Sequence, residues 1–350
     1  MYVEILVVKN TTKFLNKHKD TKTQMNISDF KSLCWKFLKI CPIFVFTKDN
    51  SNKMIENQLT SKSPSGDSGV ILIADSGSTK THWCVIRGGE IVSEVFTGGI
   101  NPFYQTDMEI IALLEEQLIP KLENPGIDSI YFYGAGCSFP EKKILVSRAL
   151  VRFFNNAMIE IQSDLLGAAR SLFQHEKGIA CILGTGSNSC LYDGKEIVEN
   201  VSPLGYILGD EGSGAVLGKL FVADCLKNQL PTELKEKFLD QYALTPATIL
   251  DNVYKKPFPN RYLAQFTPFL LENIEEPSIF NLVFDSFDAF FIRNVMQYPL
   301  EDMQVGMIGS IAHYFRDTLE IVASERGIII SDIVQNPMEG LKNFHKTPNP

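Results

Sequence analysis

One arrangement of strands and turns occurs twice in this chain, and it constrains the fold more than any other feature. Residues 71–94 read ILIADSGSTKTHWCVIRGGEIVSE, and residues 179–199 read IACILGTGSNSCLYDGKEIVE. Each copy has an apolar strand, a turn of small residues, a second strand, a glycine-containing turn that suits positive φ angles, and the letters EIV. The repeat predicts a three-stranded antiparallel meander in each half of the chain.

The first small-residue turn contains Lys80-Thr81, the pair that ends a P-loop. That motif needs a Gly before the pair and a helix after it, whereas Thr79 comes before and the strand-forming residues 82–86 come after. Backbone N–H groups of such a turn can still converge on an anion, and Ser and Thr hydroxyls add donors. An ordinary hairpin explains one such turn, but two favour a pair of facing phosphate grips, at 76–80 and 184–187.

Helices and strands follow each meander, so each half combines a sheet with helices. Apolar periodicity predicts helices at 107–122, 142–154, 165–173, 214–228 and 284–297, and strands at 129–136, 159–164 and 303–308. The order of elements is βββαβαβ in the first half and begins again at Gly178. The sequence therefore predicts an α/β fold of two lobes.

The segment before Val70 differs from the rest of the chain. Residues 1–69 carry 11 Lys and 6 acidic residues, a net charge of +5. Since the whole chain has a net charge of −8, the remaining residues carry −8 − 5 = −13. They are rich in Asn, Ser and Thr and end in SKSPSGDSG, which is typical of a linker. We expect a poorly ordered extension at 1–69, functional or an upstream mis-start, without the pattern of a secretory signal. The first lobe is expected at 70–176 plus a C-terminal helix at 331–350, and the second at 177–330.

Two aspartates follow predicted strands of the first lobe. Asp75 has no acidic counterpart in the second copy, where Gly184 takes its place, so it is a candidate ligand for Mg²⁺ beside a polyphosphate or a cap of its own turn. Asp164 stands where the last strand ends and a helix begins. It could accept a proton from an attacking hydroxyl in a cleft, or simply cap the helix.

Glycines gather in two further places. In LGYILGDEGSGAVLGK (204–219), they let the backbone fold closely around a ligand before a helix N-terminus that suits phosphate, while Asp210 could bind a sugar hydroxyl, orient the metal or cap the helix. In VGMIGSIAHYF (305–315), Gly306 and Gly309 offer bare backbone against which a purine could lie.

The motifs ADSGSTKT, LGTGSNS, GDEGSG and GMIGS, in this order, resemble those of the sugar kinase, Hsp70 and actin superfamily. From about Val70 to the end, the chain is most similar to the BadF/BadG/BcrA/BcrD ATPase family, which includes N-acetylglucosamine kinases. The resemblance implies two ribonuclease H-like lobes, duplicated βββαβαβα units, with a nucleotide cleft between them. It also implies ATP and Mg²⁺ as cofactors.

The resemblance assigns a role to each matching position. Asp164 is the implied catalytic base and Asp75 the metal ligand. The implied phosphate-binding residues are Gly77, Ser78, Thr79, Lys80, Gly184, Thr185 and Gly186; the adenosine-binding residues are Gly214, Gly306, Gly309 and Ser310; and the sugar-binding residues are Asn101, Thr185, Asn188, Gly205 and Asp210. One departure is Pro203-Leu204-Gly205, where characterised kinases carry Gly-Trp-Gly, so the identity of the sugar stays open.

These features predict an ATP-dependent kinase acting on N-acetylglucosamine or a related amino sugar, in a cytoplasmic protein that resemblance suggests is a homodimer. The acidic charge and the lack of a long apolar run argue against nucleic-acid and membrane partners. Two other functions stay open. One is an activator of 2-hydroxyacyl-CoA dehydratases, which needs exposed paired cysteines for an iron–sulfur cluster. The other is a non-catalytic sugar sensor, with an amphipathic helix at 25–40 as its DNA contact.

Overall fold

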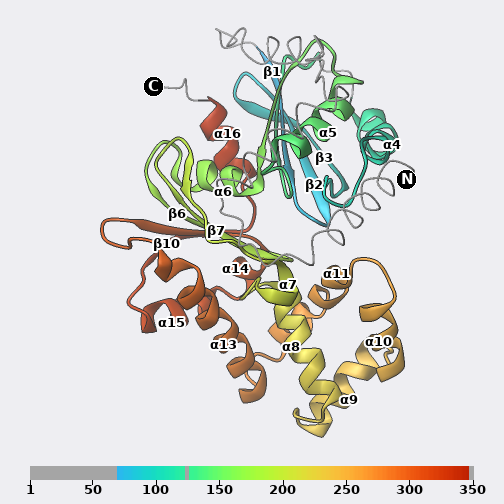
Figure 1. The fold of residues 1–350 in the computed structure, drawn as a ribbon, viewed down its shortest axis with the longest axis vertical. Helices are drawn as coiled ribbons and strands as arrows, with labels where there is room; N and C mark the ends of the chain where they lie inside the picture. Colours follow the sequence, from blue (N-terminus) through green and yellow to red (C-terminus); the bar gives the residue numbers. More distant parts are fainter. Residues whose placement is uncertain (1–68, 123–125, 347–350) are drawn as a thin grey trace, which may run out of the picture. The chain divides into compact units, whose positions relative to one another are not determined.

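The computed structural model describes residues 69–122 and 126–346, which form two five-stranded sheets with helices (Figure 1). The predicted extension at 1–69, its helix at 25–40 included, lies outside the described residues except for Gly69. No helix within the described ranges is long and apolar enough to cross a membrane.

The first sheet has the strand order β3-β2-β1-β4-β5. Its strands are β1 (Val70–Ser76), β2 (Lys80–Arg87), β3 (Glu90–Gly98), β4 (Ser129–Gly134) and β5 (Met158–Ser163). The first three form the expected antiparallel meander, whose outer turn contains Gly88 and Gly89 at φ +56° and +78°. β4 and β5 continue the sheet in parallel with β1, so the carboxyl ends of these three strands share one edge.

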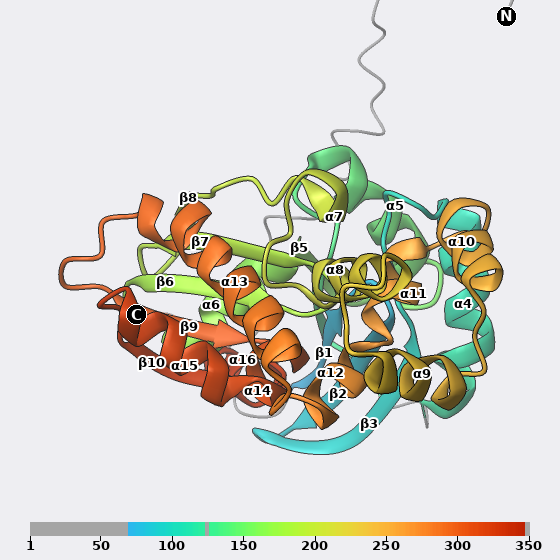
Figure 2. The same cartoon turned by 90° about the horizontal axis from the view of Figure 1, so that it is seen from below.

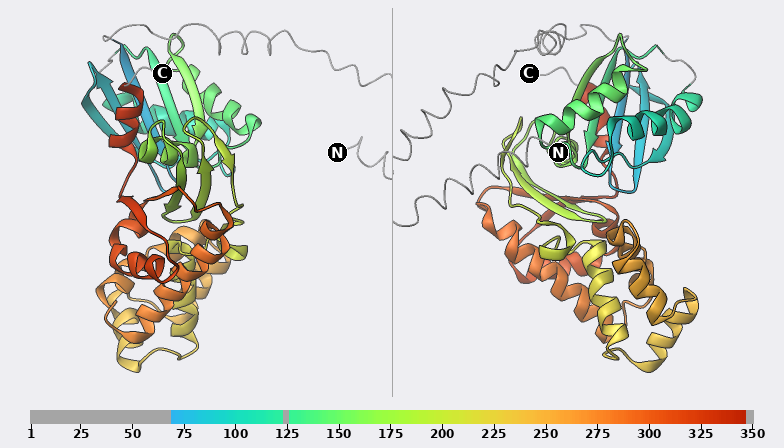
Figure 3. Two further views of the ribbon diagram at one scale, coloured as in Figure 1. Left: turned by 90° about the vertical axis from the view of Figure 1, so that its left-hand side faces the viewer. Right: turned by 45° about the vertical axis from the view of Figure 1, so that its right-hand side comes forward.

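Helices cover both faces of the first sheet. Apolar residues of α4 (Asp107–Gln117) and α5 (Pro140–Val151) pack with Leu72 and Trp83 on one face. Residues Met338 and Leu341 of α16 (Met338–Lys346) pack with Cys84 on the other. Figure 3 shows α16 beside the blue strands. The meander is therefore buried from both sides, which explains why its strands are rich in apolar residues.

The second sheet repeats the first, with the order β10-β9-β6-β7-β8. Its strands are β6 (Gly178–Leu183), β7 (Ser187–Tyr192), β8 (Ile197–Glu199), β9 (Gln304–Ile308) and β10 (Ile330–Val334). Because β6 takes the central place of β1 and β10 the edge place of β5, the two sheets have equivalent topology. The prediction of a duplicated two-lobed α/β fold is confirmed.

The second sheet also carries helices on both faces. α6 (Asp164–Phe173) packs its apolar residues against β6 and β7 on one face. On the other, α8 (Gly214–Leu226), α13 (Pro277–Arg293), α14 (Ser310–Tyr314) and α15 (Arg316–Glu325) contribute to one large core, and Figure 2 shows α13, α14 and α15 along this sheet.

An insertion of helices lies between β8 and β9. Besides α8 and α13 it contains α7 (Gly205–Leu208), α9 (Thr232–Gln241), α10 (Pro246–Tyr254), α11 (Pro259–Ala264), α12 (Thr267–Glu272) and the 3₁₀ turn Val295–Gln297. Edge-to-face aromatic contacts, among them those of Phe238 with Phe221 and with Phe269, hold these helices together. α11 packs directly on α8, an arrangement that bears on the site below.

Most of the predicted elements occur near their expected bounds, with two differences. α13 begins at Pro277, well before residue 284, because Pro suits the first helical turn and Ile279, Leu282 and Val283 extend the buried face. The segment 331–350 is not one helix: its first residues belong to β10, which pairs in parallel with β9, and the helix starts only at Met338. The division of the chain at 176/177 stays a prediction.

The contact of α8 with α11 gives a test of the packing. A Cβ at Gly218 would overlap the carbonyl oxygen of Leu263, and neither backbone can yield easily. Gly218→Ala should therefore lower the free energy of unfolding by about 1–3 kcal/mol, measured by urea denaturation. Leu220→Ala, at a side chain 38% exposed on the same helix, is the control and should cost less than about 1 kcal/mol. Equal stability of Gly218→Ala and the unmodified protein would contradict the close contact.

Candidate active site

The first small-residue turn, Gly77–Lys80, joins β1 to β2, and hydrogen bonds hold it in place. The Gly77 N–H donates to the Lys80 carbonyl (3.0 Å), which closes the turn. The buried Ser76 hydroxyl bonds the Thr81 hydroxyl (2.7 Å) and the Ile100 carbonyl (3.0 Å). These bonds tie the turn to the segment after β3 and fix its shape.

A glycine directly after β3, Gly99, lets that segment approach the turn. The Gly99 N–H donates to the Thr79 carbonyl (3.0 Å), and a Cβ on Gly99 would overlap the backbone of Gly77 and Ser78. Thr79 and Lys80 are exposed, and the Lys80 Nζ lies 5.7 Å from the centroid of the Phe96 ring. The predicted phosphate-binding residues of the first turn therefore form one unit with an ammonium group beside it.

The second small-residue turn, residues 184–186, is joined to the N-terminus of α8. Gly184 N–H donates to the Gly186 carbonyl (2.9 Å), while the N–H groups of Gly214 and Ala215 donate to the carbonyls of Gly184 (2.8 Å) and Thr185 (3.1 Å). The positive end of the α8 dipole consequently lies against this turn, an arrangement that favours a nearby anion.

The predicted adenosine residues divide into two groups. Gly309, at φ +128°, approaches so closely that a Cβ would overlap the Leu183 carbonyl oxygen, and a Cβ on Gly214 would lie 3.4 Å from the Gly184 carbonyl oxygen. These two glycines, with Ser310 beside Gly309, therefore border the second turn. Gly306 does not: it is buried in β9, where a Cβ would meet side chains of α6.

Asp75 and Asp164 lie close to each other at the carboxyl edge of the first sheet. Asp75 is level with Gln162 through β4, and Asp164 follows β5 directly. Burial, and after it the charge of Asp164, raise the pKa of Asp75 to about 7, while the charge of Lys80 lowers it. Burial likewise raises the pKa of Asp164 to about 6, against the Leu165 N–H that donates to its Oδ1 (2.9 Å). Two carboxyl groups so placed attract a proton or a cation.

Asn101 lies in a loop that contacts the end of β4. Its Oδ1 accepts from the Phe103 N–H (3.0 Å), and its own N–H donates to Gln105 Oε1 (2.7 Å). A Cβ on Gly136 would overlap this Oδ1, and Gly136 has φ +80°. The loop after β4 thus packs closely against the Asn101 side chain and limits its movement.

Asp210 borders the second turn beside Gly186. A Cβ on Gly186 would lie 3.1 Å from Asp210 Oδ2, and Asp210 itself has φ +53°. Burial raises its pKa to about 6, although the Ser187 N–H lowers it. Asp210 could accept a hydrogen bond from a ligand hydroxyl close to the phosphate turn. Gly205, at φ +75°, opens α7 nearby in the chain and is exposed.

Asn188 points into a cavity of about 280 Å³ lined by both sheets and by α6. Its Oδ1 accepts from the Ser189 N–H (2.9 Å) and from Asn200 Nδ2 (3.0 Å). Ser163 and Leu165, which flank Asp164 in the sequence, line the same cavity. The structure therefore brings Asn188 to the neighbourhood of Asp164.

Arg261 of α11 is a residue of the site that sequence patterns did not reveal. Its guanidinium donates to the Ser78 carbonyl and lies 4.2 Å from the centroid of the Phe258 ring. Its buried Nε has no partner among residues 69–122 and 126–346. Because α11 packs on α8, whose N-terminus holds the second turn, Arg261 links the two turns. An isolated Arg in a helix far along the chain carries no pattern that would indicate this.

The cysteines do not fit an iron–sulfur site. Those within the described residues are all buried, namely Cys84, Cys137, Cys181, Cys190 and Cys225. Cys34 and Cys41 lie outside the described residues.

The raised pKa of Asp75 predicts a pH effect on stability. Between its ordinary value of 3.8 and about 7, the folded protein keeps a proton that the unfolded chain has released, so stability falls as pH rises. Asp75→Asn should therefore be more stable than the unmodified protein at pH 8, by on the order of 2 kcal/mol, and similar to it near pH 4. Urea denaturation at both pH values measures this, with exposed Asp332→Asn as control. The same difference at both pH values would contradict the raised pKa.

Comparison with known proteins adds relatives of known structure. No protein-family model matches the sequence, and no curated protein matches it. A solved "putative N-acetylglucosamine kinase" from Porphyromonas gingivalis is 49% identical, with a TM-score of 0.77 over 79% of this chain and 98% of that one. A second protein of that name, from Chromobacterium violaceum, is 16% identical, with a TM-score of 0.56 over 80% and 99%, and so shows the fold alone.

The similarity to the Porphyromonas protein covers nearly all of that chain at a high identity. It agrees with the motifs in the sequence and with the duplicated sheets. The chain therefore belongs to the BadF/BadG/BcrA/BcrD ATPase family of the sugar kinase, Hsp70 and actin superfamily, among its N-acetylglucosamine kinase-like proteins.

Proposed function

We propose that this protein is an ATP-dependent kinase that phosphorylates a hydroxyl of N-acetylglucosamine or a related amino sugar. The observation that carries the proposal is the pair Asp75 and Asp164, two carboxylates of raised pKa at one sheet edge beside two small-residue turns. The name of the 49% identical relative supports the same substrate class.

The two turns would hold the phosphates of ATP. Residues 77–80 offer backbone N–H groups, two hydroxyls and the Lys80 ammonium, and residues 184–186 lie at the positive end of α8. Gly309, Ser310 and Gly214 would border the adenosine, while Gly306 takes no part because it is buried under α6. Arg261, bonded to Ser78, would keep the first turn in register with the helices behind the second.

Asp75 is suited to hold the Mg²⁺ that accompanies ATP. Without a cation, burial and the charge of Asp164 raise the pKa of Asp75 to about 7, so the protonated and ionised forms are both populated at neutral pH. A divalent cation favours the carboxylate instead, and carboxylate oxygen is a ligand that Mg²⁺ prefers. When bound, Mg²⁺ would neutralise charge on the phosphates.

Asp164 would act as the general base. With a pKa of about 6 it is mostly ionised at pH 7, yet basic enough to take a proton. The sugar hydroxyl oxygen forms its bond to the γ-phosphorus as the bond from that phosphorus to the bridging oxygen breaks, ADP leaves, and the hydroxyl proton passes to Asp164. Asn101, Thr185, Asn188, Gly205 and Asp210 would contact the sugar, which positions its hydroxyl for attack.

The alternatives are less well supported. An activator of a dehydratase needs accessible cysteines, and every cysteine in the described part of the chain is buried. A non-catalytic sensor has no need of a base at the position of Asp164. The absence of Trp at Leu204 leaves the choice among amino sugars to experiment.

A coupled ADP-release assay with Mg-ATP against N-acetylglucosamine, glucosamine, N-acetylmannosamine and glucose tests the proposal. Asp164→Asn should lower kcat by about 10²–10⁴ and leave ATP affinity nearly unchanged, because the base acts only in the chemical step. Exposed Asp332→Asn is the matched control and should keep full activity. Unchanged turnover in Asp164→Asn would remove this residue from the mechanism, and no turnover on any sugar would reject the substrate class.

The pH dependence of the rate provides a second test of the base. With Mg-ATP saturating, kcat/KM for the sugar should be flat above about pH 7 and fall as pH drops through about 6, approaching tenfold for each further pH unit. The decline follows from protonation of Asp164, which can then no longer accept the hydroxyl proton. A profile without this decline down to pH 5 would contradict the assignment.

A further inference from the structure

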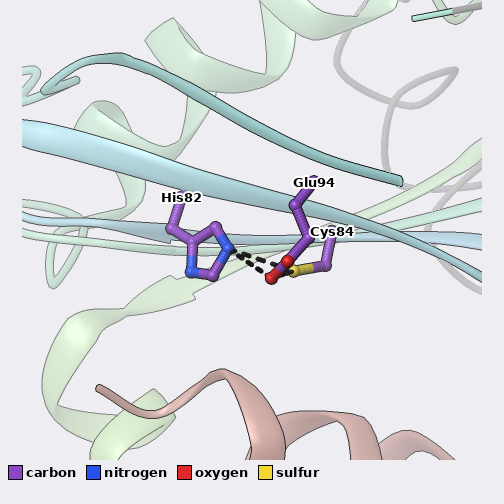
Figure 4. A group of neighbouring side chains, drawn as sticks. All are labelled: His82, Cys84 and Glu94. Carbon is purple, nitrogen blue, oxygen red and sulfur yellow. Dashed lines mark hydrogen bonds and ion pairs between the residues drawn. The ribbon is translucent and has the colours of Figure 1, made fainter. Parts of the chain in front are cut away.

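A second cluster of polar side chains lies on the first sheet, apart from the residues assigned above. His82 and Cys84 are two residues apart on β2 and so share one face, and Glu94 of β3 pairs directly with Cys84. Figure 4 shows the three side chains converging, with dashed lines between the His82 ring, the Cys84 sulfur and the Glu94 carboxylate.

The distances within this cluster are close to those of a metal site. His82 Nε2 lies 3.0 Å from Glu94 Oε1 and 3.3 Å from Cys84 Sγ, and Cys84 Sγ lies 3.5 Å from Glu94 Oε1. Tetrahedral zinc, with bonds of about 2.0–2.3 Å to nitrogen, oxygen and sulfur, places its ligand atoms about 3.3–3.6 Å apart. Shifts of a few tenths of an ångström would therefore admit the ion.

The surroundings hold these donors ready for a cation. The His82 ring stacks on Phe96 with centroids 4.3 Å apart, which fixes its orientation. Burial lowers the pKa of His82, so the ring is neutral; Nε2 donates to Glu94 without an ion and offers a lone pair to a metal in the tautomer that carries the proton on Nδ1. Burial raises the pKa of Cys84, and the charges of Glu94, Glu339 and Asp75 raise it further. A dication would offset this concentration of negative charge and displace the thiol proton.

The exposed side of the cluster leaves room for a metal ion to enter and for a fourth ligand to bind it. Cys84 is fully buried and the His82 side chain is 12% exposed, whereas the Glu94 side chain is 49% exposed. An ion could thus arrive from the Glu94 side and keep a water molecule there. The mixture of thiolate, imidazole and carboxylate favours zinc over Mg²⁺ or Ca²⁺, which take oxygen ligands.

We propose that His82 Nε2, Cys84 Sγ and Glu94 Oε1 form a zinc-binding site that links β2 to β3. All three donors differ from the residues proposed to act in phosphoryl transfer, so the site does not depend on the proposed function. His82 is nevertheless opposite Asp75 in the sheet, and a bound ion would link β2, which follows the first turn, more firmly to β3.

Zinc titration of the full-length protein, stripped with a chelator and kept reduced, tests the proposal. A competing chromophoric chelator gives the affinity, and Co²⁺ in place of zinc gives a thiolate-to-cobalt charge-transfer band. Cys84→Ala and His82→Gln should weaken binding at this site by at least about 100-fold, and Cys84→Ala should abolish the band. Cys225→Ala and exposed His313→Gln serve as matched controls and should bind as the unmodified protein does.

Two further observations make the outcome decisive. Glu94→Gln, at a half-exposed position that should not disturb folding, should lower zinc affinity by at least about tenfold and remove the zinc-dependent rise in melting temperature. Zinc binding that is equal in Cys84→Ala, Glu94→Gln and the controls would overturn the proposal, since the ion would then be held by other groups. Absence of binding in the unmodified protein would also overturn it and leave a hydrogen-bonded triad.

Discussion

Two partly buried carboxyl groups at one edge of a sheet are the constraint on which the rest of this site depends. Asp75 and Asp164 are brought together because β1 and β5 run parallel on either side of β4 and end at one edge. Burial makes each charge costly, and the cost falls only when a proton, a cation or a reacting hydroxyl is present. Because the ionised carboxyl groups are destabilised without a nearby positive charge, the site favours binding of a magnesium–phosphate complex and transfer of a proton from a reacting hydroxyl.

Close backbone contact at glycines gives the rest of the site its shape. Gly99 lets the segment after β3 lie under the first turn, and Gly309 and Gly214 bring a loop and a helix end against the second. Side chains at these positions would push the turns away from the elements that support them. Arg261 adds a direct hydrogen bond between the inserted helices and the first turn. The inserted helices are thereby coupled to the small-residue turns that both sheets supply.

The repeat of one meander was enough to predict the two-lobed α/β fold, because strand, turn and strand follow from local periodicity and turn chemistry. The same local signals located Asp164 at a strand end and both small-residue turns. They failed where the determining contact is distant: β10 becomes a strand because β9 lies beside it, and Gly306 is buried because α6 crosses over it. Arg261 could not be foreseen for that reason, since only folding brings it to Ser78. The group His82, Cys84 and Glu94 lies within the predicted meander, but its convergence depends on the pairing of Cys84 with Glu94, which local periodicity does not fix.

The most direct test of the central claim is the pKa of the two carboxyl groups, measured by NMR of protein labelled with ¹³C at the aspartate side chains. The account predicts that, in the free protein, Asp75 titrates at about 7 and Asp164 at about 6, and that a non-hydrolysable Mg-ATP analogue lowers the pKa of Asp75. Assignment by Asp75→Asn and Asp164→Asn identifies the two signals. Ordinary pKa values for both groups, or a pKa of Asp75 that the nucleotide complex leaves unchanged, would contradict the account.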